Sequence, residues 1–389
     1  MKQKWYRYMM NEIKKKIGIK KLEITGTGRF LVNRVIPGKK EGKTFKDGPA
    51  VNPEGKSIKD IPRAKCMGCG LCFSVCSFNA IEMTTDESSF VPVLDEETCT
   101  QCGKCFRSCP GINVLDYPGR LGEVQHMYVT HAKDPDIRHA SSSGGTCRSI
   151  LTALLEKKIV DRVIITRATE DPYRPETIIT SSVEDLSGDR LNSIYSPTSP
   201  LCSLKDLDRG LKYAFVGLPC HVAGISLSKA LRKSIYLTIG IFCSHTPGFE
   251  FLNAFLGDLP QKEDIQRLSF RGRGWPGKST IYYSSGKPHG IWFPAMWNMY
   301  NEKKKYQLAR CSTCTYYSAE FADISIGDPW SLVREDRNGS SLVFARTERG
   351  MNAMQEAAYL VSMQEIEDDR RADILRFHNE SAASKQMNG

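Results

Sequence analysis

Three features are missing from this sequence, and each absence excludes a class of protein. No stretch of the 389 residues approaches the run of roughly 18 apolar residues that a membrane-spanning helix needs. The first residues, MKQKWYRYMMNEIKKKIG, lack an apolar core followed by a small-residue cleavage site, so they do not form a secretory signal. The sequence has no G-x-G-x-x-G pattern after a predicted strand, since the run GRGWPG at 272–277 follows none, so a Rossmann dinucleotide site is not supported.

Cysteine is abundant although no export signal accompanies it. The chain has 14 cysteines. In the reducing cytosol, thiols act as metal ligands or catalysts rather than as cross-links. We therefore expect a cytoplasmic protein in which most cysteines have a chemical task.

The positive charge of the chain is concentrated near its beginning. Residues 1–65 hold 18 Lys and Arg against 6 Asp and Glu, whereas the rest of the chain is close to neutral. Residues 1–62 also contain turn signals and are predicted to form an extended basic arm. Such an arm is either a solvated tail or a docking segment for an acidic partner or an anionic membrane surface. Because no recognition motif accompanies the charge, we expect no binding to nucleic acid.

Eight of the cysteines form two copies of the pattern C-x2-C-x2-C-x3-C. This spacing lets three thiolates of one run bind a 4Fe-4S cluster while the fourth reaches the neighbouring cluster. The pattern predicts that one cluster is bound by Cys66, Cys69, Cys72 and Cys109, and the other by Cys99, Cys102, Cys105 and Cys76. Zinc and disulfides are the alternatives, but a doubled triple-cysteine run is not usual zinc-ribbon spacing.

After about residue 121 the sequence alternates between strand and helix patterns. Apolar alternation or apolar runs predict strands, and apolar residues at three- and four-residue spacing predict helices. The predicted strands are 124–132, 160–168, 212–220, 234–243 and 322–330, and the predicted helices are 149–160, 222–231 and 348–373. The fold class expected is α+β or α/β, with a bacterial-type two-cluster ferredoxin module fused to a mixed α/β body.

A serine- and glycine-rich turn precedes the first predicted helix of the body. Its residues are Ser141, Ser142, Ser143, Gly144, Gly145 and Thr146. Such a turn at a helix N-terminus offers backbone N–H groups, hydroxyls and a positive dipole end to a phosphate. A simple helix cap with a flexible lead-in explains the same residues.

Four further cysteines are candidates for a third metal site. Cys220 and Cys243 each end a predicted strand, and Cys311 and Cys314 form a C-x2-C pair. If the two strands are neighbours in a sheet, their carboxyl ends bring Cys220 and Cys243 together. The four could hold a third cluster or a zinc ion, or they could be buried structural cysteines. The remaining two, Cys147 and Cys202, are interpreted as ordinary core residues.

Several segments of the body resemble one known family. The runs HASSSGGTCRSILTALLEKKIVDRVI, YAFVGLPCHVAGI, IGIFCSHTP, FRGRGW and CSTCTYYSAEFADISIGDPW are similar, in content and order, to the coenzyme F420-reducing hydrogenase beta-subunit family. The resemblance covers roughly 63–350. It implies a ferredoxin module at 63–117, an N-terminal-type family domain at 118–205 and a C-terminal-type domain with a third cluster at 206–350. The basic arm at 1–62 and a helical tail at 351–389, both predicted from composition and pattern, complete the expected domain organisation.

The resemblance also implies cofactors and the residues that contact them. It implies FAD between a site for the deazaflavin coenzyme F420 and a cluster in the body, with the serine–glycine turn contacting the FAD pyrophosphate. A second segment around Tyr195 and Ser199 is implied to line the flavin. Basic groups would suit the acidic tail of coenzyme F420, and Arg271, Arg273, Lys205 and His221 are the candidates. A solvated turn explains the two arginines equally well.

The function expected from this resemblance is that of an electron-input subunit for reduced coenzyme F420. A hydride from the coenzyme would reach FAD, and single electrons would leave through the clusters to a partner protein. No catalytic acid or base is expected. The alternatives are a ferredoxin-driven flavin reductase of another substrate, a chain that only feeds a separate catalytic subunit, and a non-catalytic electron-transfer subunit. The basic arm would dock on the partner or on a membrane complex.

Overall fold

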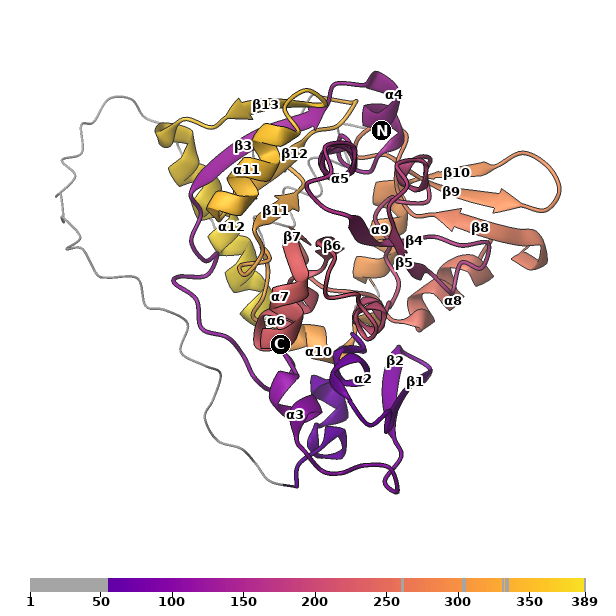
Figure 1. Ribbon diagram of the computed structural model, residues 1–389. Coiled ribbons are helices and arrows are strands. Elements are labelled where there is room, and N and C mark those ends of the chain that lie inside the picture. Colours follow the sequence, from indigo (N-terminus) through magenta and orange to yellow (C-terminus); the bar gives the residue numbers. More distant parts are fainter. Residues whose placement is uncertain (1–54, 260–261, 303–305, 331, 333–335, 388–389) are drawn as a thin grey trace. The chain divides into compact units, whose positions relative to one another are not determined.

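The computed structural model describes residues 55–259, 262–302, 306–330, 332 and 336–387 (Figure 1). The predicted basic arm therefore lies almost wholly outside the described residues. Everything below concerns one compact unit that begins at Asp47.

The ferredoxin module is built from two short helices and a hairpin. Its elements are η1 (Ile58–Asp60), η2 (Arg63–Lys65), α2 (Leu71–Val75), β1 (Ile81–Thr85), β2 (Phe90–Leu94) and α3 (Lys104–Ser108). Both α-helices follow a glycine in the left-handed conformation, Gly70 (φ 83°) and Gly103 (φ 71°). Glycine adopts this conformation without steric cost, so the chain can turn sharply between the second and third cysteines of each run. The duplicated sequence pattern thus gives a duplicated local structure.

The folded module begins before residue 63. Ser57 and Asp60 cap η1 reciprocally, and Ile58 is buried against Ile81 and Cys105. The last residues of the predicted arm are therefore part of the module core.

The body is organised around one mixed eight-stranded sheet (Figure 1). The strand order is β13 (Val361–Glu365), β3 (His126–Ala132), β12 (Ser341–Ala345), β11 (Ile324–Gly327), β7 (Ile235–Ile241), β6 (Tyr213–Gly217), β4 (Arg162–Arg167) and β5 (Glu176–Thr180). The four central strands, β11, β7, β6 and β4, are parallel, and the flanking pairs are antiparallel. The predicted mixed α/β body is confirmed.

Helices and short turns connect these strands. They are α4 (Pro135–Ala140), α5 (Thr146–Glu156), η3 (Glu184–Leu186), η4 (Pro200–Leu204), α6 (Pro219–Leu227), α7 (Lys229–Ser234), α11 (Glu348–Glu356) and α12 (Asp368–Met387). The largest core cluster packs α5 and α11 against the sheet through residues such as Ile150, Leu154, Leu237 and Met354. This core fixes the ends of the central strands, where the candidate site lies.

A smaller antiparallel sheet is inserted between β7 and β11. It has the order β10 (His289–Trp292), β9 (Lys278–Tyr283), β8 (Ile265–Ser269) and is accompanied by α8 (Phe249–Gly257), η5 (Lys262–Asp264), α9 (Phe293–Glu302) and α10 (Ala309–Ser312). Its own aromatic-rich core includes Phe251, Phe270 and Tyr300. Within the described part of the chain, no helix combines the length and apolar character needed to cross a membrane.

Two element predictions were wrong in part. The predicted helix 222–231 is interrupted, because Ser228 is extended and its hydroxyl caps α7. The predicted helix 348–373 contains strand β13, which pairs with β3 at the sheet edge from Val361 to Glu365. Pairing with a distant strand decided this conformation, and the local apolar spacing did not reveal it.

Candidate functional site

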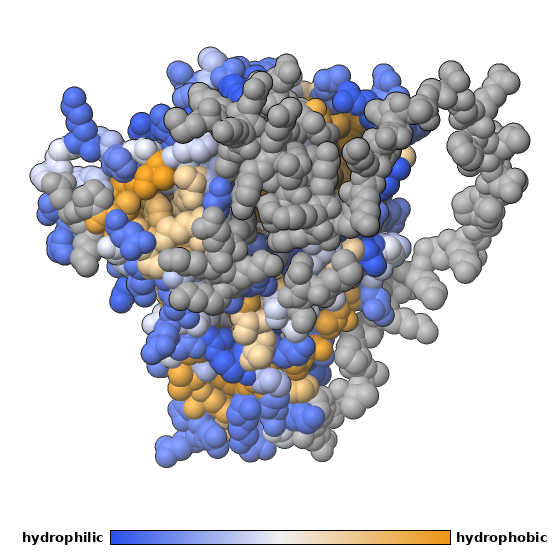
Figure 2. Space-filling model, turned by 180° about the vertical axis from the view of Figure 1, so that it is seen from behind, coloured by the Kyte–Doolittle hydropathy of each residue, from blue (hydrophilic) through white to orange (hydrophobic). Residues whose placement is uncertain are grey.

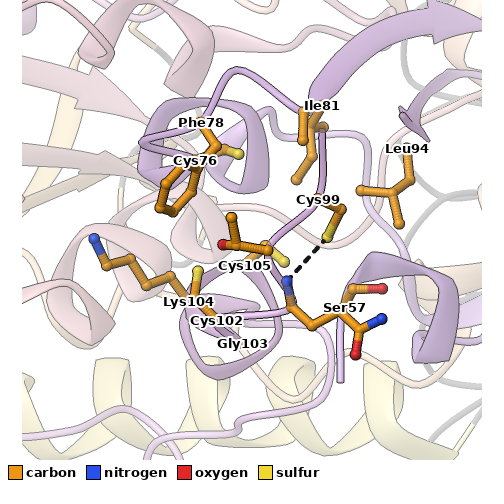
Figure 3. Close-up of a pocket in the computed structure, with 13 residues that line it drawn as sticks. Ser57, Cys76, Phe78, Ile81, Leu94, Cys99, Cys102, Gly103, Lys104 and Cys105 are labelled. Carbon is orange, nitrogen blue, oxygen red and sulfur yellow. Dashed lines mark hydrogen bonds between the residues drawn. The ribbon is translucent and has the colours of Figure 1, made fainter. Parts of the chain in front are cut away.

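Four cysteines of the ferredoxin module surround one hollow, which Figure 3 shows in close-up. The hollow is lined by Cys76, Cys99, Cys102 and Cys105, with Ile81 and Leu94 among the apolar residues around it. Cys76 comes from the end of α2 and the other three from the run around α3. This is the exchange of the fourth ligand between the two runs that the spacing predicts.

Backbone N–H groups point at the sulfurs of this set. The Gln101 N–H donates to Cys99 Sγ at 3.4 Å. Burial raises the pKa of the Cys105 thiol, while backbone N–H groups of Ile58 and Phe106 lower it in part. Hydrogen bonds to cluster sulfurs are one of the means by which proteins adjust cluster potentials.

The second set of the module is more deeply placed. Burial raises the pKa of the Cys72 thiol, and the neighbouring thiols of Cys66 and Cys109 raise it further. Burial also raises the pKa of Cys109 to about 11, with Cys66 again a neighbour. Cys69 has Cys72 and Cys109 beside it, so the four thiols of the predicted set form one mutually interacting group.

A third set of four cysteines lies in the body. Cys220 begins α6 directly after β6, and Cys243 follows β7, which is the parallel neighbour of β6. Burial raises the pKa of Cys220, and the thiols of Cys314, Cys243 and Cys311 raise it further. The Thr246 N–H donates to Cys311 Sγ at 3.3 Å. The expectation that neighbouring strands bring these cysteines together is confirmed.

A 4Fe-4S cluster and a single metal ion require different arrangements of thiols. Among the described residues, no group of three or more His, Cys, Asp or Glu side chains is arranged to hold one metal ion. A cubane cluster, by contrast, is bound at four separate iron corners, so its thiolates stand around a volume. The sulfur-lined hollow and the N–H donors at Cys99 and Cys311 fit such a cluster.

One cysteine set of the module interacts electrostatically with residues of the body. Burial is the largest cause that raises the pKa of Cys69. The thiols of its own set also raise this pKa, and so does the thiol of Cys220 in the body. Buried Arg310 precedes Cys311 of the body set, and its charge lowers the pKa of Cys109 in the module. Two of its nitrogens, Nε and one Nη, have no hydrogen-bond partner. A buried cation thus stands beside two groups of thiols.

The serine–glycine turn is joined to two other segments of the body. The Ser193 N–H donates to Ser142 Oγ at 2.9 Å, and Asn192 Nδ2 donates to the Ala140 carbonyl at 2.9 Å. A Cβ placed on Gly272 would lie 2.6 Å from Asn192 Nδ2, so the FRGRGW segment also closes on this point. Three segments that the family resemblance singles out therefore converge.

Asp328 is the centre of this convergence. Arg271 donates to its carboxylate through both terminal nitrogens, at 2.7 and 2.9 Å. Trp275 Nε1 and Ser143 Oγ each donate to Asp328 Oδ1 at 2.9 Å. Burial raises the pKa of Asp328, but Arg271 and these hydrogen bonds outweigh it, and the net pKa lies below its ordinary value. The sequence had not singled out Asp328, although its position directly after β11 is a signal.

The fit of this region to a phosphate rests on backbone rather than on hydroxyls. Ser141 Oγ donates to the Ile137 carbonyl, and Thr146 Oγ1 is bonded to Thr130 Oγ1. Ser143 is engaged by Asp328, so the turn hydroxyls already have protein partners. The N-terminus of α5 has Gly145 as its cap and no side-chain cap, which leaves its first N–H groups for an anion.

Tyr195 occupies an aromatic cluster next to Arg271. Its ring lies 5.4 Å from Phe293 and 5.3 Å from Trp297 between centroids. His245 stacks on Trp297 and on Tyr300, and Tyr300 adjoins the thiols of Cys311 and Cys243. Tyr195 and the third cysteine set are thus linked by continuous aromatic packing. The sequence did not reveal this link, because its members are far apart in the chain.

The remaining predicted contact residues lie elsewhere. Ser199 contacts Cys202, and Lys205 lies 3.9 Å above the Phe73 ring, so both belong to the contact with the ferredoxin module. His221 is buried, accepts from the Leu218 N–H, and has its pKa lowered to about 4 by burial. Arg273 is exposed near Tyr282. None of them contacts the Ser–Gly turn through the bonds described above.

Family sequence models match most of the chain. The coenzyme F420 hydrogenase/dehydrogenase beta-subunit models match residues 127–205 (N-terminal part) and 210–369 (C-terminal part). Models of a 4Fe-4S dicluster domain match residues 65–111 and 91–151.

Three curated relatives carry names that refer to coenzyme F420. A subunit of the F420H2 dehydrogenase of Methanosarcina mazei is 26% identical over 309 residues, which are 76% of this chain and 83% of that one. The beta subunit of coenzyme F420 hydrogenase from Methanococcus voltae is 27% identical over 62% of this chain and 84% of that one. Coenzyme F420-dependent sulfite reductase of Methanocaldococcus jannaschii is 26% identical over 86% of this chain, which spans 53% of that protein.

A solved structure has the same fold. A chain of the F420-reducing [NiFe] hydrogenase complex from Methanosarcina barkeri superposes with a TM-score of 0.53 at 20% identity, over 70% of this chain and 92% of that one. Together with the ferredoxin module and the order of the matched segments, these likenesses identify the chain as a member of the coenzyme F420 hydrogenase/dehydrogenase beta-subunit family.

Proposed function

We propose that the chain is a cytoplasmic oxidoreductase subunit that takes electrons from reduced coenzyme F420 and passes them, through FAD and three 4Fe-4S clusters, to a partner protein. Its family and its relatives, which are named as subunits of F420-linked oxidoreductases, support this proposal. The single observation that carries it is the adjacency of the module to α6, the helix that holds Cys220: a Cβ on Gly224 of this helix would lie 3.0 Å from Leu71 Cδ2. Because of this adjacency, the cluster site of the body and those of the module would form one electron-transfer path.

The proposed ligand sets are the three cysteine groups of the structure. The body cluster is held by Cys220, Cys243, Cys311 and Cys314, the inner module cluster by Cys66, Cys69, Cys72 and Cys109, and the outer module cluster by Cys76, Cys99, Cys102 and Cys105. Each of the three sets has one buried cysteine, and the outer set alone has an exposed one, Cys102. Electrons would therefore leave the chain at the outer cluster.

FAD is proposed at the junction of the Ser–Gly turn and the segment that begins at Asn192. A flavin supplies exchange between hydride and single electrons, and 4Fe-4S clusters carry single electrons. The uncapped N-terminus of α5 would bind the pyrophosphate. Ser196 Oγ, which is buried without a hydrogen-bond partner, offers a further polar contact in this segment. Arg271 and Asp328 would hold the walls of the site together.

The body residues would orient the reactants and exclude water. Tyr195, Phe293 and Trp297 form an apolar wall next to the Arg271–Asp328 pair. No side-chain proton transfer is required for hydride transfer, so we assign no catalytic acid or base. Arg273, exposed next to the same segment, remains the candidate for the acidic tail of coenzyme F420.

The test is an anaerobic measurement of cofactor content and electron uptake. The purified chain should hold one FAD and about twelve irons, and mixing with F420H2 should bleach flavin and cluster absorption. Cys220→Ser should lower the iron content by about four, whereas Cys147→Ser, in a half-buried cysteine outside all three sets, should keep it. About eight irons in the unaltered chain would contradict the third cluster. Full loading without bleaching would favour a ferredoxin-driven reductase of another substrate.

The basic arm is proposed to dock the chain on its partner or on a membrane complex. Because Ser57 and Ile58 belong to the module core, the clean deletion removes residues 1–54. We expect it to keep F420H2 oxidation by a small artificial acceptor and to abolish transfer to the partner protein. Unchanged transfer to the partner would remove the arm from the docking interface.

A further inference from the structure

Helix α12 approaches the body cysteines from a segment that the family models do not cover. The matched region ends at residue 369, whereas α12 runs from Asp368 to Met387. Ile374, His378 and Ala382 repeat every four residues and are each 1% exposed. Residues at this spacing share one helix face, so α12 buries a narrow stripe along its length.

The buried stripe holds α12 against the strand end that carries Cys243. Phe242, which precedes that cysteine, packs on His378 with ring centroids 5.3 Å apart. Tyr317 OH is bonded to His378 Nδ1 at 3.2 Å, and Tyr317 and Ala382 share a core cluster. Contacts with Phe242 and Tyr317 therefore fix the position of α12 relative to Cys243.

One turn beyond this stripe, a lysine reaches the cysteines. Lys385 Nζ donates to the Cys243 carbonyl at 3.0 Å and to the Tyr316 carbonyl. A lysine ammonium group is a donor only, and these two carbonyls are its acceptors. Cys243 belongs to the body set and Tyr316 lies two residues after Cys314, so the positive charge stands beside the body cysteines.

We propose that Lys385 is the positioned cation that sets the reduction potential of the body cluster. Reduction adds one negative charge to a cluster, and a nearby ammonium group in a buried setting stabilises the reduced form more than the oxidised one. The lysine would thus make the body cluster an acceptor for electrons that enter the chain. The inference depends on the third cluster of the proposed function.

The rival explanation is a structural tether, in which Lys385 only ties the end of α12 to two carbonyls. Lys385→Gln keeps hydrogen-bond donors and removes the charge, whereas Lys385→Arg keeps the charge. Arg376→Gln is the matched control, because Arg376 is on the same helix and 70% exposed. If Lys385 is only a tether, its substitution changes the stability of α12. If Lys385 sets the potential, the reduction potential of the body cluster changes when the charge is removed and stays the same when the charge is kept.

The experiment is a redox titration of the full chain followed by electron paramagnetic resonance, with iron content measured for each variant. The body-cluster signal is identified by its absence in Cys220→Ser. At a fixed ambient potential we expect Lys385→Gln to lower the reduced-to-oxidised ratio of that cluster about tenfold, equivalent to about 59 mV for one electron. Lys385→Arg and Arg376→Gln should stay near the unaltered protein.

Other outcomes overturn the inference in distinguishable ways. An unchanged ratio in Lys385→Gln at about twelve irons would leave the third cluster in place and remove Lys385 from its control. Loss of about four irons in Lys385→Gln alone would make the lysine a structural tether. About eight irons in the unaltered protein would overturn the third cluster and, with it, this inference.

Discussion

At the scale of single residues, the body contains charged groups and imidazoles that are buried. Arg271 and Asp328 have side chains only 3% and 16% exposed, and they join the smaller sheet to the strand end of β11. His221 and His378 are buried close to the body cysteine set. The stability of the chain therefore depends on whether each of these side chains is charged.

Removing the carboxylate of Asp328 should destabilise the chain strongly. Asp328→Ala leaves the Arg271 guanidinium buried and unpaired, which costs about 3–5 kcal/mol. Asp373→Ala is the control, because its ion pair with Arg376 is about 70% exposed on both sides and contributes about 0–1 kcal/mol. Anaerobic urea unfolding measures both. If both substitutions lowered the free energy of unfolding equally, the buried pair of Asp328 and Arg271 would not be the stronger contribution.

The buried histidines should make the chain less stable as the pH falls below neutrality. Burial lowers the pKa of His221 and of His378 to about 4, below the value of about 6.5 in an unfolded chain. Their contribution to stability is complete above pH 6.5 and is lost as the pH falls from there toward 4. Between pH 7.5 and 5.5 each should remove about 1.4 kcal/mol from the free energy of unfolding.

His221→Asn separates this effect from the general acid sensitivity of the protein. The variant lacks one titrating group, so its loss of stability between the two pH values should be smaller by about 1.4 kcal/mol. Urea unfolding at both pH values gives the comparison. A pH dependence as steep as that of the unaltered chain would show that His221 is protonated equally in both states.

At the scale of elements, the contact between η4 and α2 couples the module to the body. The Leu201 N–H donates to the Cys69 carbonyl at 3.0 Å, and Ser74 Oγ donates to the Leu201 carbonyl. Gly70 makes this approach feasible: a Cβ there would lie 2.3 Å from Cys202 Sγ and 2.9 Å from the Cys202 backbone nitrogen. The first cysteine run is thereby held against the body.

Gly70→Ala should loosen this contact, and Gly119→Ala is its matched control. Both glycines have positive φ, so each alanine costs about 1–2 kcal/mol in backbone strain. A Cβ at Gly119 meets nothing within 4 Å, whereas at Gly70 it displaces η4. We expect faster trypsin cleavage after exposed Arg120, between module and body, in Gly70→Ala only. Similar cleavage of both variants would mean that backbone strain alone explains the effect.

The elements also show which parts of the fold were predictable from sequence. The module could be predicted because all its cysteines lie within 44 consecutive residues and their spacing is local. Cys220 and Cys243 could be paired because parallel neighbours end at the same sheet edge. Strand β13 and the approach of Lys385 could not, since both depend on contacts with distant segments and neither leaves a local pattern.

At the scale of the whole described unit, the outer cysteine set is the one with an exposed member, Cys102. Of the five large apolar side chains that are exposed in the described residues, Phe78, Val93 and Val114 belong to the module. Figure 2 shows apolar surface at the lower end of the view, where Figure 1 places the module. Such surface beside the outer cysteine set suits contact with a protein partner.

Disabling the outer cluster should interrupt the route at its exit. Cys99→Ser should lose about four irons, keep bleaching of the flavin and of the other clusters by F420H2, and reduce transfer to a protein acceptor at least tenfold. Cys147→Ser provides the control for a half-buried cysteine outside the sets. Anaerobic stopped-flow absorbance follows both steps. Undiminished transfer would place the exit at another cluster.

The scatter of the body cysteines along the chain has a consequence for how the protein is made. The module cysteines are complete once residue 109 has been synthesised, whereas the body set draws on three separate segments that end with Cys314, and Lys385 comes later still. Synthesis proceeds at about 5–20 residues per second and domains fold as they emerge. Iron–sulfur insertion would therefore proceed in two stages, with the module competent on the ribosome and the body only after the central sheet has closed.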